Sequence, residues 1–165
     1  MTIEKKQKHP FVEYLERLQS TPGAMSALRV GLGKSPGMEP GMHRYIAPWT
    51  SNVPPWVERA YYTLASLYPL NSRPGGVGNM GRHLRAVGAS TAMEQQFQVL
   101  LAAPGDQLYR LLPSLVQRLK SADVAVNWTQ LLRDITSWDH PDKYVQRAWA
   151  RGFWGNEFVK KEKTE

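Results

Sequence analysis

Apolar side chains recur every three or four residues along almost the whole chain, and this spacing restricts the fold more than any other feature. Such spacing places apolar residues on one side of an α-helix, whereas a half-buried β-strand alternates apolar and polar residues. Alternating runs of β-branched residues, which are typical of strands, do not occur. The sequence therefore predicts an all-α protein with about nine helices.

The longest helix is expected in the centre of the chain, where it begins at Pro54 and Pro55. Its apolar residues repeat at helical steps, which predicts a buried stripe made of Trp56, Ala60, Leu64 and Leu67. Core packing is favoured over base stacking for the Trp residues that lie on such stripes. These are Trp56, Trp128, Trp138, Trp149 and Trp154, whereas Trp49 stays undecided.

Further helix signals follow in the second half of the chain. Asp106 can cap a helix whose buried side is Leu108, Leu112, Leu115 and Leu119. Pro113 inside this helix is expected to kink or split it. Asn127 is expected to cap the next helix. The segment 71–78 is rich in Gly and Pro, which predicts an exposed and mobile connection.

The chain is long enough for one domain but not for a large multidomain enzyme. Its 165 residues, of which 42% are hydrophobic, predict a single compact helical unit, with two small lobes that share a core as the alternative. We expect this domain to span residues 9–155. Residues 1–8 and 156–165 are expected to form flexible tails.

The absence of Cys excludes disulfides, thiolate metal sites and a Cys nucleophile. A reducing, cytoplasmic location fits this composition. Residues 1–9 are charged and polar without a following apolar run, so no signal peptide is expected. No apolar stretch approaches the length of a membrane span. We therefore expect a soluble cytoplasmic protein with no membrane partner.

Positive charge is concentrated in the middle of the chain. The whole sequence has 21 Lys and Arg against 14 Asp and Glu, a net charge of +7. Residues 21–90 contain seven of these basic side chains and two acidic ones, an excess of five. A basic region of this kind indicates a polyanionic partner. The alternative is a solvated surface that only keeps the protein soluble.

The residues that catalyse reactions or bind metals show no recognisable arrangement. The four His residues lack metal-ligand spacing, and surface or capping roles are expected for His9, His43, His83 and His140. Asp134 and Asp139 lie five residues apart, too far round a helix to act together. No nucleophile motif is present. We expect no enzymatic activity, no metal, no cofactor and no small-molecule substrate.

A Gly-x-Gly-x-x-Gly pattern occurs at Gly76, Gly78 and Gly81. The dinucleotide-binding fingerprint also requires a preceding strand, a long following helix and an acidic residue about 20 positions later, and none is evident. Two interpretations remain. The loop and the start of the next helix could offer N–H groups to a phosphate beside Arg82 and Arg85, or the segment could be a plain flexible loop.

A set of short motifs recurs in a characteristic order from Phe11 to Trp154. The motifs are Leu28-Arg29, His43-Arg44-Tyr45 before Pro48-Trp49, Gly81-Arg82-x-Leu84-Arg85, Phe97-x-x-Leu100-Leu101, Leu131-Leu132-Arg133-Asp134 with Trp138, Val145-x-x-x-Trp149-Ala150-Arg151 and Phe153-Trp154. In this order and spacing the chain resembles the CasB family, the small subunit of the type I-E CRISPR surveillance complex Cascade.

The resemblance implies an all-helical, enzymatically inert protein that is present as two copies in Cascade. Its partners would be the other Cascade subunits, a second copy of itself, the guide RNA, the target DNA and the displaced DNA strand. It would bind the nucleic-acid backbone without reading sequence and would stabilise the R-loop. Basic positions of the family pattern coincide with Arg29, Arg44, Arg82 and Arg85.

Other basic residues complete the predicted interface. Lys34 and Arg73 belong to the basic middle of the chain, and Arg133 matches only some family members. Many members are basic where this chain has Val30, Leu111 and Pro113, and the missing charge could come from Arg110, Arg118 and Lys120. Two alternatives stay open: a free-standing helical nucleic-acid-binding module, and a protein-only adaptor whose basic patch meets an acidic partner.

Overall fold

The computed structural model describes residues 7–155, and this part of the chain contains helices and loops but no strand. Within it lie nine α-helices: α1 (Pro10–Leu18), α2 (Ala24–Val30), α3 (His43–Ile46), α4 (Pro55–Leu67), α5 (Met80–Val87), α6 (Thr91–Ala102), α7 (Leu108–Ser121), α8 (Trp128–Thr136) and α9 (Tyr144–Trp154). Four 3₁₀ turns accompany them: η1 (Pro40–Met42), η2 (Ala47–Trp49), η3 (Tyr68–Leu70) and η4 (Gly105–Gln107). The all-α prediction is confirmed.

The predicted tails fall largely beyond this range, since residues 1–6 and 156–165 lie outside the described residues. The domain limits at 9 and 155 therefore stay a prediction. Among the described helices, none is long and apolar enough to cross a membrane.

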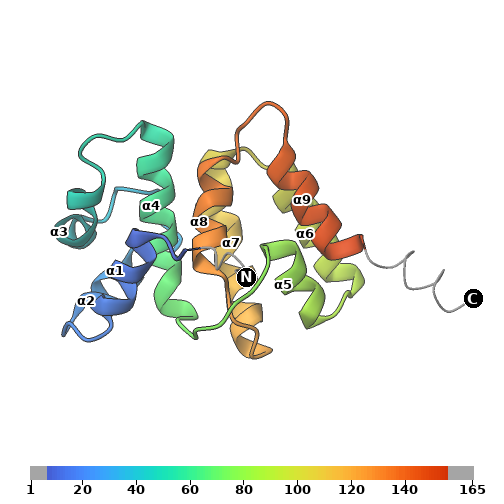
Figure 1. Ribbon diagram of the computed structural model, residues 1–165, viewed down its shortest axis with the longest axis horizontal. Coiled ribbons are helices and arrows are strands. Elements are labelled where there is room, and N and C mark those ends of the chain that lie inside the picture. Colours follow the sequence, from blue (N-terminus) through green and yellow to red (C-terminus); the bar gives the residue numbers. More distant parts are fainter. Residues whose placement is uncertain (1–6, 156–165) are drawn as a thin grey trace, which may run out of the picture.

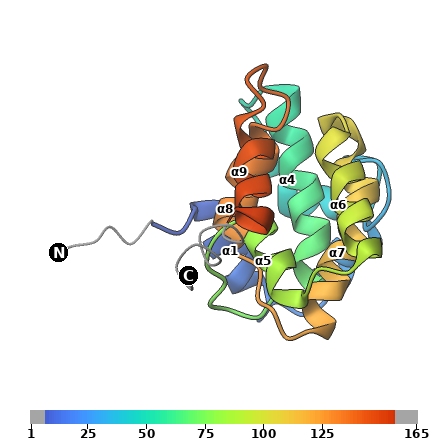
Figure 2. The same cartoon turned by 90° about the vertical axis from the view of Figure 1, so that its right-hand side faces the viewer.

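The helices form two sides with a shared centre. Helices α1 to α4 lie on one side, α5, α6 and α9 lie on the other, and α7 and α8 lie between them (Figure 1). Figure 2 shows the molecule from the side of α5, α6 and α9. Across the centre α4 packs against α8, and on the far side α5 packs against α9.

One hydrophobic core joins the two sides. Buried residues from each of the nine described α-helices belong to the same cluster. Its largest fully buried side chains are Trp138, Trp149, Tyr68, Phe11, Phe97 and Phe153. Burial of large apolar surfaces of this kind is the main source of folding free energy. The two sides therefore share one core.

Trp56 corrects the predicted core stripe of the central helix. Its side chain is 53% exposed, whereas Ala60, Leu64 and Leu67 are buried as expected. Trp56 stands in the first turn of α4, directly after Pro55, and the buried part of α4 begins only at Ala60. The helical spacing was therefore correct, but the first turn extends past the elements that cover the rest of the helix.

Helix α7 differs from the prediction at two residues. Asp106 does not cap it, because it lies inside η4 and Gln107 takes the capping position without a side-chain hydrogen bond. Pro113 does not split the helix, which continues to Ser121. Leu112 beside it is fully buried, and packing of this kind compensates the backbone hydrogen bond that a Pro removes. The predicted cap at Asn127 is confirmed, since its side chain accepts a hydrogen bond from the N–H of Gln130.

The connection between η3 and α5 is more tightly packed than its composition predicts. Asn71 is buried, donates to the carbonyl of Val124 at 2.9 Å and accepts a 3.0 Å hydrogen bond from the indole of Trp128. A Cβ at Gly76 would lie 2.3 Å from the backbone carbon of Val126, so only Gly fits there. Asn71 and Gly76 thus lie against the segment that leads into α8, whereas Arg73, Pro74, Gly75 and Val77 are exposed as expected.

Candidate nucleic-acid interface

Helix α5 presents two predicted site residues on its outer face. Met80, Gly81, His83 and Leu84 form its buried side, while Arg82 is exposed and Arg85 is half-buried. Residues three apart on a helix are neighbours on its surface. Arg82 and Arg85 therefore lie together.

Close contact with α9 holds α5 in place. The Asn79 side chain caps α5 by accepting the N–H of Arg82 at 3.0 Å, and its amide donates to the carbonyl of Ala148 at 3.1 Å. A Cβ at Gly81 would lie 1.9 Å from the carbonyl oxygen of Trp149, so the two helices approach as closely as Gly allows. Gly76 and Gly81 thus serve chain packing, which neither interpretation of the Gly-rich motif anticipated.

His83 anchors the inner face of α5 to α8. Its Nε2 accepts a 3.0 Å hydrogen bond from the backbone N–H of Asn127, the residue that caps α8. Burial, with a smaller effect of the neighbouring Arg82 charge, lowers the pKa of His83 to about 4. The imidazole is therefore neutral near pH 7 and acts as a structural acceptor.

The other His residues follow the prediction more closely. His9 caps α1 by accepting the N–H of Phe11, and His140 accepts the N–H of Asp142. His43 is exposed. The expectation of surface and capping roles is therefore wrong only for His83, whose burial depends on how α5 meets α8.

Arg29 and Arg44 lie on the opposite side of the molecule from α5. Arg29 is exposed at the end of α2, and Arg44 is exposed on α3 with its guanidinium 5.4 Å from the centre of the Tyr45 ring. Buried Leu28 and Ile46 attach these short helices to the core. In the described part of the chain, no carboxylate forms an ion pair with Arg29, Arg44 or Arg82.

Two further candidates are already paired. Lys34 lies 2.8 Å from the carboxylate of Glu39, and this contact lowers the pKa of Glu39. Arg73 lies 2.9 Å from the carboxylate of Asp123. Both pairs are exposed, so they are weak, but a phosphate would have to compete with the carboxylate.

The remaining candidates are exposed on α7 and α8. Arg133 donates to the backbone carbonyl of Gln7 at 3.4 Å. Arg110, Arg118 and Lys120 lie on α7, and the first two line a groove between α6 and α7. The structure thus brings together Arg82 with Arg85 on α5, whereas Arg110 and Arg118 lie eight residues apart along α7.

Sequence reasoning missed the surroundings of Trp56. The exposed ring lines a hollow of about 570 Å³ with Arg59, Thr136, Asp139 and His140. Arg59 pairs with Asp139 at 3.0 Å, and Asp139 also accepts the N–H of Gly105. The sequence did offer one indication that Trp56 could be exposed, which is its position in the first helical turn after Pro54 and Pro55.

Asp134 and Asp139, the two acidic residues considered in the sequence, belong to no metal site in the described part of the chain. Within residues 7–155 no group of three or more His, Asp or Glu side chains is placed to hold a metal ion. Asp134 and Asp139 instead accept hydrogen bonds from Trp149 and Gly105.

Comparison with known proteins identifies the family. Residues 24–154 match the family model of the CRISPR-associated protein Cse2. A CRISPR-associated protein Cse2 from Thermus thermophilus is 31% identical to this chain, over 94% of each chain.

Solved structures agree with this match. The crystal structure of CasB from M. ruber is 31% identical, covers 93% of this chain and 94% of its own, and superposes with a TM-score of 0.76. A chain in a CRISPR RNA-guided surveillance complex is 27% identical, with coverage of 94% and 99% and a TM-score of 0.75. These matches confirm the resemblance seen in the sequence motifs. The chain belongs to the Cse2 family of CRISPR-associated proteins.

Proposed function

We propose that this chain is the non-catalytic small subunit of a CRISPR RNA-guided surveillance complex, where it binds the nucleic-acid backbone and stabilises the R-loop. The observation that carries the proposal is the likeness to a chain of such a complex, which extends over 99% of that chain. Its partners would be the other subunits, a second copy of itself, the guide RNA, the target DNA and the displaced strand.

Exposed arginines supply the electrostatic part of this function. Arg29, Arg44 and Arg82 make no ion pair within the described residues. No ion pair among these residues therefore has to break before one of them binds a phosphate. R-loop formation exchanges one duplex for another of similar stability, and contacts from protein to backbone shift that balance. A few such contacts therefore suffice to prolong the open state without any reading of bases.

The other basic residues predicted to contact nucleic acid differ in how available their charges are. Lys34 and Arg73 would first have to release Glu39 and Asp123. Arg85 and Arg133 sit on the surfaces of α5 and α8, and Lys120 lies in the last turn of α7. The main contacts of the proposal are Arg29 and Arg44 on one side of the molecule, and Arg82 and Arg85 on the other.

The non-catalytic part of the proposal rests on what the acidic side chains already do. Asp134 and Asp139 are engaged in hydrogen bonds that hold helices and loops together. Metal-dependent nucleases need carboxylates that are available to a cation. Incubated with Mg²⁺ or Mn²⁺, the pure protein should leave single-stranded, duplex and hybrid nucleic acids intact. Cleavage that disappears when one acidic residue is replaced would contradict this part.

The decisive experiment measures the lifetime of the R-loop in a reconstituted complex. The double variant Arg82→Ala with Arg85→Ala should shorten this lifetime and leave guide RNA loading unchanged, because base pairing still reads the sequence. Arg73→Ala is the matched control, since its charge is paired with Asp123. Circular dichroism should show equal helicity for all proteins. A double variant with the wild-type lifetime would contradict the proposed role of α5.

Assembly of the complex and DNA binding by the isolated chain separate the two alternatives. A free-standing nucleic-acid-binding module would bind DNA alone but would not enter the complex. A protein-only adaptor would enter the complex, yet the isolated chain would show no binding to single-stranded or duplex DNA even at low salt.

A further inference from the structure

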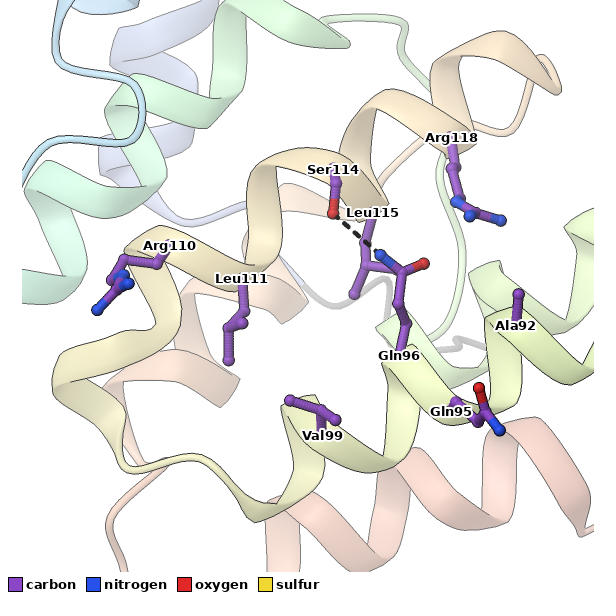
Figure 3. A pocket seen from close by; sticks show the side chains of 9 residues that line it. All are labelled: Ala92, Gln95, Gln96, Val99, Arg110, Leu111, Ser114, Leu115 and Arg118. Atoms are coloured by element: carbon purple, nitrogen blue, oxygen red, sulfur yellow. Dashed lines mark hydrogen bonds between the residues drawn. The ribbon is translucent and has the colours of Figure 1, made fainter.

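A groove of about 410 Å³ runs between α6 and α7. Its apolar lining includes Val99, which is 58% exposed, together with Leu111 and Leu115. Figure 3 shows Val99 on α6 and Leu111 on α7 facing the space between the two helices. Helix α6 buries Met93 and Phe97 on its opposite side, so Val99 takes no part in the core and its exposure costs free energy.

Positive charge flanks this apolar lining. Arg110 and Arg118 lie towards opposite ends of the groove (Figure 3), and no carboxylate is among its lining residues. The two arginines are eight residues apart on one helix, which separates their backbones by about 12 Å along the axis. Within residues 7–155, Arg110 donates a 3.2 Å hydrogen bond to the neutral side chain of Gln107, and neither Arg110 nor Arg118 forms an ion pair.

A buried polar atom lies between these ends. Gln96 donates through Nε2 to the hydroxyl of Ser114 at 3.4 Å, across the groove. Its Oε1 is buried, and no described residue donates a hydrogen bond to it. In Figure 3 this oxygen points away from Ser114, along the space between α6 and α7. A buried acceptor without a donor is costly, so this part of the groove is not optimised for stability alone.

We propose that this groove docks an amphipathic helix from another protein subunit of the complex. Apolar side chains of that helix would cover Val99 and Leu111. Acidic residues about two turns apart would face Arg110 and Arg118, because a spacing of about 12 Å corresponds to eight residues of a helix. The identity of the partner as a subunit rests on the proposed function above.

The chemistry of the groove favours this occupant over nucleic acid. A phosphate backbone would be attracted to Arg110 and Arg118, but it would gain nothing by covering Val99 and Leu111. An acidic amphipathic helix satisfies both the charges and the apolar surface. Arg110 and Arg118, predicted from the sequence to bind nucleic acid, are thereby reassigned to a protein contact.

A second copy of this chain that is related by a twofold axis through the groove fits it less well. Two copies related by a twofold axis through this face would place the same surface against itself. Arg110 and Arg118 would then meet the same arginines, and no carboxylate of the lining could separate them. Like charges facing each other across an interface disfavour association.

The test compares charge substitutions inside and outside the groove. Val99→Glu places a carboxylate on the apolar lining, and Gln98→Glu places one on an exposed neighbouring position of α6 that does not line the groove. Arg118→Glu reverses the charge at one end of the groove. Arg17→Glu makes the same charge reversal at an exposed position of α1, outside the groove. All four side chains are exposed, so each variant should fold, and thermal melts of the isolated proteins verify this.

Native mass spectrometry of the reconstituted complex then gives the fraction of complexes that retain this chain. Retention of Val99→Glu and Arg118→Glu should fall at least about tenfold, as for charges placed against an interface. Gln98→Glu and Arg17→Glu should be retained like wild type. Wild-type retention of both groove variants would overturn the inference. Failure of the wild-type chain to assemble would instead overturn the proposed function.

Cross-linking distinguishes the occupants. A photoreactive benzoylphenylalanine introduced at position 99 of the full chain, within the assembled complex, should form a protease-sensitive, nuclease-resistant adduct with another subunit. An adduct with nucleic acid, an adduct with a second copy of this chain, or no adduct at all would each overturn the inference.

Discussion

Trp149 donates its indole N–H to the carboxylate of Asp134 at 2.7 Å, and both side chains are buried between α8 and α9. The other carboxylate oxygen of Asp134 accepts a 2.9 Å hydrogen bond from Gln130. Trp149 also stacks edge to face on Trp138, with ring centres 4.9 Å apart. This carboxylate therefore holds the position of the helix against which α5 packs.

Replacing Asp134 with Ala should lower the free energy of unfolding by about 3 kcal/mol, because it leaves the buried indole N–H of Trp149 without an acceptor. Urea denaturation followed by circular dichroism measures the change. Asp142→Ala serves as the control, since Asp142 is exposed on the loop before α9. Equal unfolding midpoints for the two variants would contradict the structural role of Asp134.

His83 should make stability depend on pH below neutrality. Burial lowers its pKa in the folded protein from 6.5 to about 4, so the unfolded chain binds more protons between these values. Stability is therefore fully present above about pH 6.5 and falls as the pH decreases towards 4, by about 3 kcal/mol in total. Burial also lowers the pKa of His9, which acts in the same direction.

Melting temperatures measured between pH 7 and pH 4 check this expectation. His83→Gln is a matched variant, because an amide oxygen can accept the N–H of Asn127 but does not titrate. Its melting temperature should change less with pH than that of the wild type. A variant with the same pH dependence as the wild type would show that His83 does not cause it.

The two Trp residues at the extremes of burial should differ in their effect on stability. Trp149→Ala removes a side chain that is fully buried and should cost about 3–5 kcal/mol. Trp56→Ala removes a side chain that is 53% exposed and should cost about 1 kcal/mol or less. Chemical denaturation of both variants measures the difference. A large loss for Trp56→Ala would mean that its first helical turn is covered in solution.

The salt dependence of DNA binding tests the arginines of α5. Each neutralised phosphate contributes about 0.7 to 0.9 to the slope of log affinity against log salt. The double variant Arg82→Ala with Arg85→Ala should therefore bind more weakly whatever the sequence, with a slope shallower by about one to two units. Fluorescence anisotropy with single-stranded and duplex DNA at several salt concentrations provides the measurement.

Two controls accompany this comparison. Arg73→Ala should change the slope less, because Arg73 is paired with Asp123 at 2.9 Å. Asp106→Asn should leave the slope nearly unchanged. A double variant with the wild-type slope would indicate that the surface around Arg82 and Arg85 is merely solvated.

The sequence by itself determined the fold class and the family. Helical spacing predicted the buried side of α7, with Leu108, Leu112, Leu115 and Leu119 all buried in the structure. The cap at Asn127 was also predictable, because a capping side chain acts within four residues of chain. The ordered motifs identified the family before any contact between helices was known. These properties depend on residues close together in sequence.

Only the tertiary structure decided which side chains remain exposed or paired. Helical spacing indicates that Trp56 and Ala60 share one side of α4, but not where the covering elements end. The same limit applies to Arg73 and Asp123, which are 50 residues apart yet form an ion pair. The groove between α6 and α7 is likewise set by how two separate helices approach each other. Spacing along one helix carries no information about its neighbours, and the packing of distant segments supplies it.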